Sequence, residues 1–83
     1  MEWKWIIDVL GWIGSMELVV AYYLVSTKRL GPTTYLYQSL NLTGSIFLLV
    51  NTAYYGAFPS SFVNVVWTII ALMALYQITK QKV

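Results

Sequence analysis

The sequence contains no cysteine and no histidine, and only 10% of its residues are charged. Without these two residue types, disulfides, Cys/His zinc sites, haem attachment and His-dependent catalytic triads are excluded. A typical soluble domain carries about 25% charged residues, and one of this size must cover much of its surface with polar groups. The five basic and three acidic residues of this 83-residue chain are too few for that. The deficit predicts an integral membrane protein.

Three long apolar segments make up most of the chain. They run over about 5–25, 34–55 and 60–78. Each is close to the roughly 20 residues that cross a hydrocarbon core of about 30 Å as a helix. Gly31-Pro32 and Gly56, with Pro59 just beyond, separate the segments, because glycine permits a tight reversal and proline does not continue a helix. We therefore predict one all-α domain over 1–83, a bundle of three transmembrane helices.

The basic residues are divided unevenly between the two expected ends of the bundle. Four fall on one side and only Lys4 on the other; the four are Lys28, Arg29, Lys80 and Lys82. The positive-inside rule then places the first loop and the C-terminus in the cytoplasm and the N-terminus outside. Glu2 and Asp8 are atypical of a basic leader, so we expect no cleaved signal peptide. No basic run is long enough to follow a phosphate backbone, which excludes nucleic acid as a partner.

Polar residues recur on one face of each expected helix when positions are placed at intervals of about 100°. On the second segment these are Gln38, Asn41, Ser45, Thr52 and Tyr55; on the third, Ser61, Asn64 and Thr68; on the first, Asp8, Ser15, Tyr22 and Ser26. Two interpretations stay open. The stripes either hold helices together, at about 0.6 kcal/mol per hydrogen bond, or line a cavity for a solute. Gly11, Gly14 and Gly44 would allow close helix packing, whereas the carboxamides favour a cavity.

Glu17 is the only ionisable residue near the middle of a segment. A charged carboxylate there costs several kcal/mol unless it is paired, so it is either a protonated interhelical hydrogen-bonding group or a proton-coupling site. No second carboxylate, metal-ligand cluster or activated nucleophile accompanies it. The sequence therefore predicts no enzyme, no cofactor and no metal site.

The chain resembles the SemiSWEET transporters of the PQ-loop superfamily, bacterial three-helix half-units of the SWEET sugar transporters. The resemblance covers nearly the whole chain and rests on the three segments, the short basic first loop, the Tyr55-Gly56 pair and the spacing from Pro59 to Asn64. It is similar, still more closely, to short uncharacterised bacterial relatives of that superfamily. The resemblance implies a homodimer in the bacterial inner membrane, with Asn64 binding a sugar hydroxyl.

Two positions depart from the SemiSWEET pattern. The family's Pro-Gln dipeptide falls at Val19-Val20, so the hinge of the first helix is missing. The family's sugar-stacking tryptophan falls near Thr52, which has no ring, and Trp67, one turn from Asn64, is the candidate replacement. The resemblance therefore supports the fold more strongly than transport.

We accordingly expect a homodimer of six helices that moves a small polar solute, with a sugar as one candidate, by alternating access. The residues expected to line its path are Asn64, Thr68, Asn41, Ser45, Thr52, Tyr55 and Trp67. The alternative is a membrane module without transport activity, an accessory subunit or structural oligomer whose polar residues only pack helices.

Overall fold

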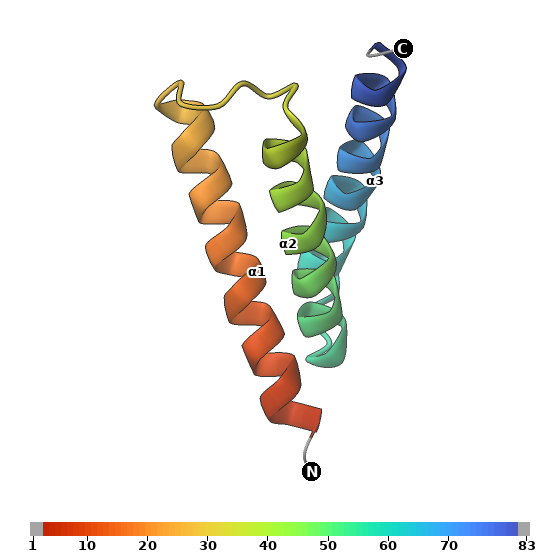
Figure 1. The fold of residues 1–83 in the computed structure, drawn as a ribbon. Helices are drawn as coiled ribbons and strands as arrows, with labels where there is room; N and C mark the ends of the chain where they lie inside the picture. Colours follow the sequence, from red (N-terminus) through yellow and green to blue (C-terminus); the bar gives the residue numbers. More distant parts are fainter. Residues whose placement is uncertain (1–2, 82–83) are drawn as a thin grey trace.

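A computed structural model of the chain describes residues 3–81, so Glu2 and Lys82, which entered the sequence argument, lie outside the described residues. Within that range the chain forms three α-helices (Figure 1). They are α1 (Trp3–Ser26), α2 (Tyr35–Tyr54) and α3 (Phe58–Gln81). The prediction of an all-α protein with three helices is confirmed. Helices α1 and α3 extend beyond the predicted segments because polar residues at their ends, such as Lys4 and Lys80, are compatible with a helix.

The two turns follow from local chemistry. Thr34 caps α2, because its hydroxyl accepts a hydrogen bond from the backbone N–H of Tyr37 at 3.3 Å. After α2, Gly56 adopts a positive φ of 72°, a conformation that glycine reaches without steric cost. Pro59 then occupies the first turn of α3, where its missing N–H has no helical partner to lose. Gly56 therefore lies in the turn between α2 and α3, and Pro59 lies in the first turn of α3.

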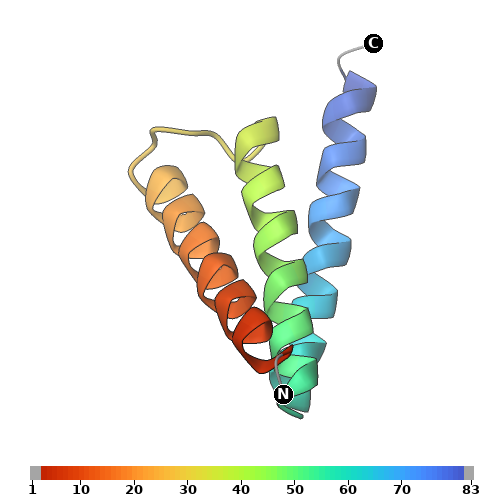
Figure 2. The ribbon, with the colours of Figure 1, turned by 60° about the horizontal axis from the view of Figure 1, so that its bottom comes forward.

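Helix α2 lies between the other two helices. It packs against α1 on one side and α3 on the other, whereas α1 and α3 make no close backbone contact with each other within residues 3–81. Figure 2 shows α1 and α3 diverging from α2 toward the end that carries the α1–α2 loop. The C-terminal end of α3 lies at that same end, and the start of α1 lies at the opposite one (Figure 1).

The buried residues are mostly small, and the large apolar residues point outward. The buried set is Gly11, Gly14, Ala21, Gly44, Ser45, Asn64, Ala71 and Ile78. Helices α1 and α3 are long and apolar enough to cross a membrane, and only 11% and 6% of their most apolar stretches are buried. A core helix of a soluble protein would instead be mostly buried. Helix α2 has 20 residues but is less apolar, since it carries much of the polar stripe.

Candidate functional site: a polar groove along α2

The contact between α1 and α2 is built on glycine. A Cβ atom placed on Gly14 would lie 2.7 Å from the backbone oxygen of Gly44, and one on Gly44 would lie 3.0 Å from that of Gly14. A Cβ on Gly11 would overlap the side-chain amide of Asn51. The prediction that these glycines allow close helix packing is confirmed, and α1 is held within van der Waals distance of the α2 backbone.

The contact between α2 and α3 contains three pairs of hydroxyl groups, which we call the hydroxyl seam. The pairs are Tyr35–Thr79 at 3.0 Å, Ser45–Thr68 at 2.9 Å and Thr52–Ser61 at 2.9 Å. They are distributed along almost the full length of α2. Each pair joins one helix to the other, so these side chains tie the helices together.

Three residues that were predicted from the sequence to line a solute path, Ser45, Thr52 and Thr68, belong to this seam. Ser45 is fully buried and pairs with Thr68, so neither hydroxyl is free for a solute. Thr52 borders a hollow, but its hydroxyl accepts from Ser61 and donates toward the Leu48 carbonyl. The structure therefore places these three in helix packing. Spacing alone could not separate them from the cavity residues, because all lie on one polar stripe.

Beside the seam, a cleft of about 280 Å³ opens between the three helices. This central cleft is lined by Leu18 and Tyr22 of α1, Tyr37 and Asn41 of α2, and Val63, Asn64 and Trp67 of α3. Three of the predicted site residues, Asn41, Asn64 and Trp67, thus come together from two helices. Asn64 is only 9% exposed. Trp67 and Tyr22 remain 48% and 72% exposed, so the cleft is open on one side.

The two carboxamides of the central cleft have no hydrogen-bond partner among residues 3–81. A carboxamide without partners is costly in an apolar environment, since each unmade bond leaves a donor or acceptor unsatisfied. The hydroxyl groups of Ser45, Ser61 and Thr68, each about one turn from one of these carboxamides, are paired across the two helices, so the contrast is not due to a general lack of partners. Asn41 and Asn64 are therefore available to bind a ligand, as are the polar groups of the aromatic side chains that line the cleft.

The central cleft belongs to a longer groove along α2. An adjoining hollow of about 320 Å³ shares Val63 and Asn64 with it and is bordered by Leu48. Leu48 in turn borders a pocket of about 180 Å³, which we call the Asp8 pocket. Neighbouring hollows share lining residues, and we call this row of hollows beside α2, between α1 and α3, the groove. It runs from the central cleft toward the N-terminal end of α1.

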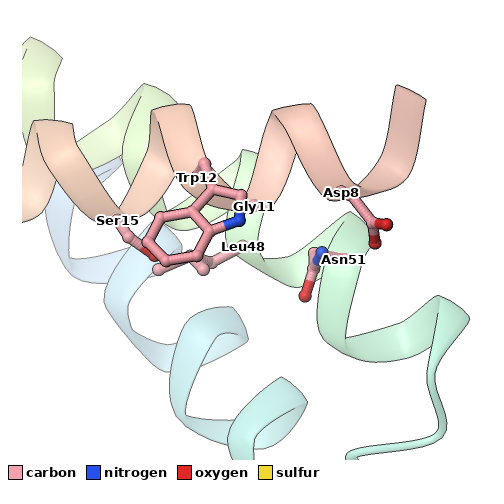
Figure 3. A pocket seen from close by; sticks show the side chains of 6 residues that line it. All are labelled: Asp8, Gly11, Trp12, Ser15, Leu48 and Asn51. Carbon is pink, nitrogen blue, oxygen red and sulfur yellow. The ribbon is translucent and has the colours of Figure 1, made fainter. Parts of the chain in front are cut away.

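The Asp8 pocket is lined by Asp8, Gly11, Trp12, Ser15, Leu48 and Asn51. Figure 3 shows the indole of Trp12 near Gly11 and Leu48, with the Asp8 and Asn51 side chains at the other end. Sequence analysis did not single out Asn51. The signal was present, because Asn51 lies seven residues after Gly44 and so on the same face of α2. Its amide donates to the backbone carbonyl of Ile7 at 3.0 Å, which makes it a structural link.

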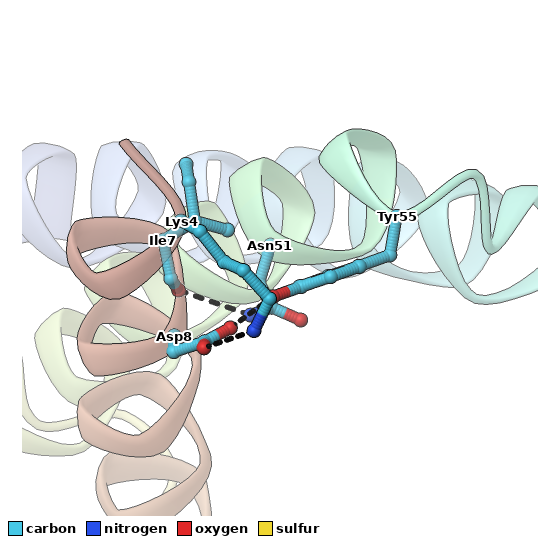
Figure 4. Close-up of polar contacts among 5 residues, drawn as sticks. All are labelled: Lys4, Ile7, Asp8, Asn51 and Tyr55. Carbon is cyan, nitrogen blue, oxygen red and sulfur yellow. Dashed lines mark hydrogen bonds and ion pairs between the residues drawn. The ribbon is translucent and has the colours of Figure 1, made fainter. Parts of the chain in front are cut away.

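Tyr55, which was also predicted to line the path, lies at the end of α2 and not in the central cleft. Its hydroxyl donates to the Asp8 carboxylate, and Lys4 Nζ lies 3.1 Å from the other oxygen of that carboxylate (Figure 4). The hydrogen bond to Asp8 raises the pKa of the Tyr55 hydroxyl, so this group stays protonated and remains a donor. Tyr55 therefore fastens the end of α2 to α1.

The chemistry of the central cleft is neutral. It presents two carboxamides, two tyrosines and an indole, which donate and accept hydrogen bonds and offer ring faces. In residues 3–81, no three acidic, cysteine or histidine side chains gather in a way that could hold a metal ion. The cleft suits an uncharged polar molecule with several hydroxyl or amide groups.

A protein-family model matches residues 7–82. The chain belongs to this family, whose function is unknown. Neither the curated proteins nor the solved structures contain a match to the chain. The function proposed below is therefore inferred from the groove and from the chemistry of the residues that line it.

Proposed function

We propose that the protein is an integral membrane protein in which all three helices cross the bilayer. Its exposed surface is rich in large apolar side chains, including Ile69, Ile70 and Leu72 at 50%, 53% and 51% exposure. Such a surface is stable against lipid and costly in water. Helix α2, less apolar by itself, turns much of its polar stripe toward α1, α3 and the groove.

The bundle is proposed to have its N-terminus outside and its C-terminus in the cytoplasm of a bacterial inner membrane. Lys28, Arg29 and Lys80 lie at one end of the bundle, while Lys4 lies at the other. The positive-inside rule assigns the more basic end to the cytoplasm. Reporter fusions at the two termini test this directly. A cytoplasmic N-terminus would contradict the assignment.

Within this membrane protein we infer a binding path for a small polar solute, which two copies of the chain would move by alternating access. The observation that carries the inference is the pair of unpartnered carboxamides, Asn41 and Asn64, facing one cleft beside Trp67. A carboxamide can both donate to and accept from a hydroxyl, and an aromatic ring packs against the apolar face of a solute. The spacing from Pro59 to Asn64, which resembles that of SemiSWEET transporters, makes sugars the first solutes to test.

A second copy is part of the proposal because the groove is open along one side. In a lone chain, lipid would contact Asn41 and Asn64 and leave their hydrogen bonds unmade. Two grooves facing each other across a two-fold axis would enclose these four carboxamides among six helices. The solute would then lie near the middle of the dimer, where repeats of transporters meet.

The decisive experiment compares two identical substitutions, Asn64→Ala and Asn51→Ala. Both remove a carboxamide, but the Asn64 carboxamide has no partner among residues 3–81, whereas that of Asn51 bonds the Ile7 carbonyl. In proteoliposomes offered sugars and other small neutral solutes, Asn64→Ala should abolish uptake while cross-linking still detects the dimer. Asn51→Ala should keep uptake per folded molecule and lower the free energy of unfolding by about 0.6–1.7 kcal/mol.

The rival function, a structural module or accessory subunit without transport activity, is favoured by the hydroxyl seam, which shows that many polar residues do pack helices. On that reading Asn64→Ala would weaken assembly by about 1 kcal/mol and change no solute movement. Failure of the wild type to move any solute under any gradient, or isolation of a stable monomer from membranes, would favour the rival.

A further inference from the structure

Glu17 lies at the contact between α1 and α2, one turn along α1 from Gly14. It lines none of the hollows of the groove described above. Instead its Oε2 atom lies 3.0 Å from the hydroxyl oxygen of Thr43 on α2. Thr43 immediately precedes Gly44, so the carboxyl group adjoins the closest approach of the two helix backbones. Any change at this carboxyl group acts directly on the α1–α2 contact.

Thr43 has two possible acceptors for its single hydroxyl hydrogen. Its Oγ1 atom is 3.0 Å from Glu17 Oε2 and also 3.0 Å from the backbone carbonyl oxygen of Ser39. The carbonyl oxygen can only accept. If Glu17 is charged, Thr43 can donate its hydrogen to the carboxylate, and its hydrogen bond to the Ser39 carbonyl is then lost. If Glu17 is protonated, the carboxyl O–H can donate to Thr43 while Thr43 donates to Ser39, so both bonds form together.

The second oxygen of Glu17, Oε1, is buried and has no hydrogen-bond partner among the described residues. A charged carboxylate spreads its charge over both oxygens, so an unpartnered buried Oε1 penalises the charged form. A protonated carboxyl group loses much less at its carbonyl oxygen. The geometry of both oxygens therefore favours a bound proton.

No nearby charge offsets this preference. Helix α2, the one element packed against α1, has no charged residue, and its tyrosines lie only in its first and last turns. On α1, Tyr22 and Tyr23 are the nearest ionisable residues in sequence, and both project at least about 120° away from Glu17. Lys4 and Asp8 pair with each other nearer the start of α1. In the part of the chain that the structure describes, Glu17 therefore has no cation to stabilise its charged form.

We propose that Glu17, with Thr43 as its switchable partner, is a proton-binding site at the α1–α2 contact. The proton comes from water and forms the carboxyl O–H bond, and Thr43 then donates to Ser39. Release returns the proton to water, and the Thr43 hydrogen turns to the carboxylate. One hydroxyl rotation thus links the protonation of α1 to the hydrogen bonding of α2, at the contact that positions one wall of the central cleft.

The test measures the proton directly and needs no transported solute. Protein in liposomes is treated with dicyclohexylcarbodiimide, an apolar reagent for protonated carboxyl groups, and the modified peptides are quantified between pH 5 and pH 9. At pH 7 we expect Glu17 to react at least about tenfold faster than Asp8 in the same molecule, whose exposed carboxylate is paired with Lys4 and Tyr55. Glu17→Gln should remove the label at this position.

Thr43→Val and Thr43→Ser test the switch. Valine keeps the shape but removes the hydroxyl that donates to charged Glu17 and accepts from protonated Glu17. The bond to the charged form is the stronger of the two, so labelling should persist to a higher pH than in the wild type. Serine keeps the hydroxyl and should behave as the wild type. Labelling of Glu17 only in acid, in parallel with Asp8, would overturn the proposal, and so would an unchanged profile in Thr43→Val. Whether this proton also drives uptake rests on the proposed function and is tested separately. In that case uptake by Glu17→Gln should no longer depend on pH.

Discussion

In the hydroxyl seam between α2 and α3, every polar group reaches across and finds a partner on the opposite helix. In the central cleft, one turn away on the same two helices, Asn41 and Asn64 line the same space, and neither carboxamide has a hydrogen-bond partner among residues 3–81. Both regions contain polar side chains of α2 and α3. The two regions differ in whether the opposite helix places a hydrogen-bonding side chain within reach. Polarity inside a helical bundle therefore identifies a candidate site only where it is left unpaired.

The central cleft depends on α1, which supplies one of its walls, whereas the hydroxyl seam contains no residue of α1. Helix α1 is held against α2 by the Gly14–Gly44 contact, by the Glu17–Thr43 bond, by the Asn51 link to Ile7 and by the Lys4–Asp8–Tyr55 cluster. Moving α1 away should therefore destroy the cleft and leave the hydroxyl seam intact.

The largest effect is expected from Gly14→Ala. The added Cβ would meet the Gly44 backbone oxygen at 2.7 Å, and backbone cannot give way as a flexible side chain can. We expect the free energy of unfolding in detergent to fall by about 1–3 kcal/mol, as for other overpacked contacts, and uptake to be lost with it.

Gly31→Ala is the matched control, since a Cβ at that loop position meets nothing within 4 Å. It should change stability by no more than about 0.5 kcal/mol. A Gly14→Ala protein as stable and active as Gly31→Ala would show that α1 is not held by the glycine contact, and the cleft geometry would have to be revised.

Much of the fold could be predicted from the sequence. Three apolar segments, the Gly56 turn and the close packing at Gly14 and Gly44 all depend on local composition and helical period, which a sequence displays. The roles within the polar stripe could not be predicted. Whether Thr68 meets Ser45 or faces a cleft depends on how far α3 is shifted along α2, and that shift is set by the packing of all side chains together.

Asn51 illustrates the same limit. Its amide fits against Gly11 only because that glycine lacks a side chain, so its role as a link depends on residues 40 positions apart. Helical spacing placed it on the Gly44 face but could not show which residue of α1 lay opposite. The pairing of helix faces is a tertiary property, and here it decides which amide is structural and which remains free.

The smallest effect, and the sharpest comparison with Asn64, is expected from Thr68→Val. Valine keeps the shape of threonine and removes only the hydroxyl, which bonds Ser45 of α2 and donates to the Asn64 carbonyl oxygen in its own helix. The single hydroxyl hydrogen of Ser45 would then be donated to the Leu42 carbonyl, whose oxygen lies 3.0 Å away, so no buried hydroxyl is left without a partner. The loss of unfolding free energy should therefore be about 0.6 kcal/mol, the usual scale for one interhelical hydrogen bond in a membrane.

Solute uptake by Thr68→Val, normalised to folded protein, should equal that of the wild type, although the residue lies one turn from Asn64. Thr27→Val is a suitable control, because the Thr27 hydroxyl bonds only carbonyls of its own segment and joins no second helix. Comparing the two isolates the interhelical bond. If Thr68→Val abolished uptake without loss of stability, the hydroxyl seam would be part of the solute path. A hydroxyl that is already bonded across the helices would then also bind the solute. Pairing within the protein would no longer distinguish structural polar groups from solute-binding ones.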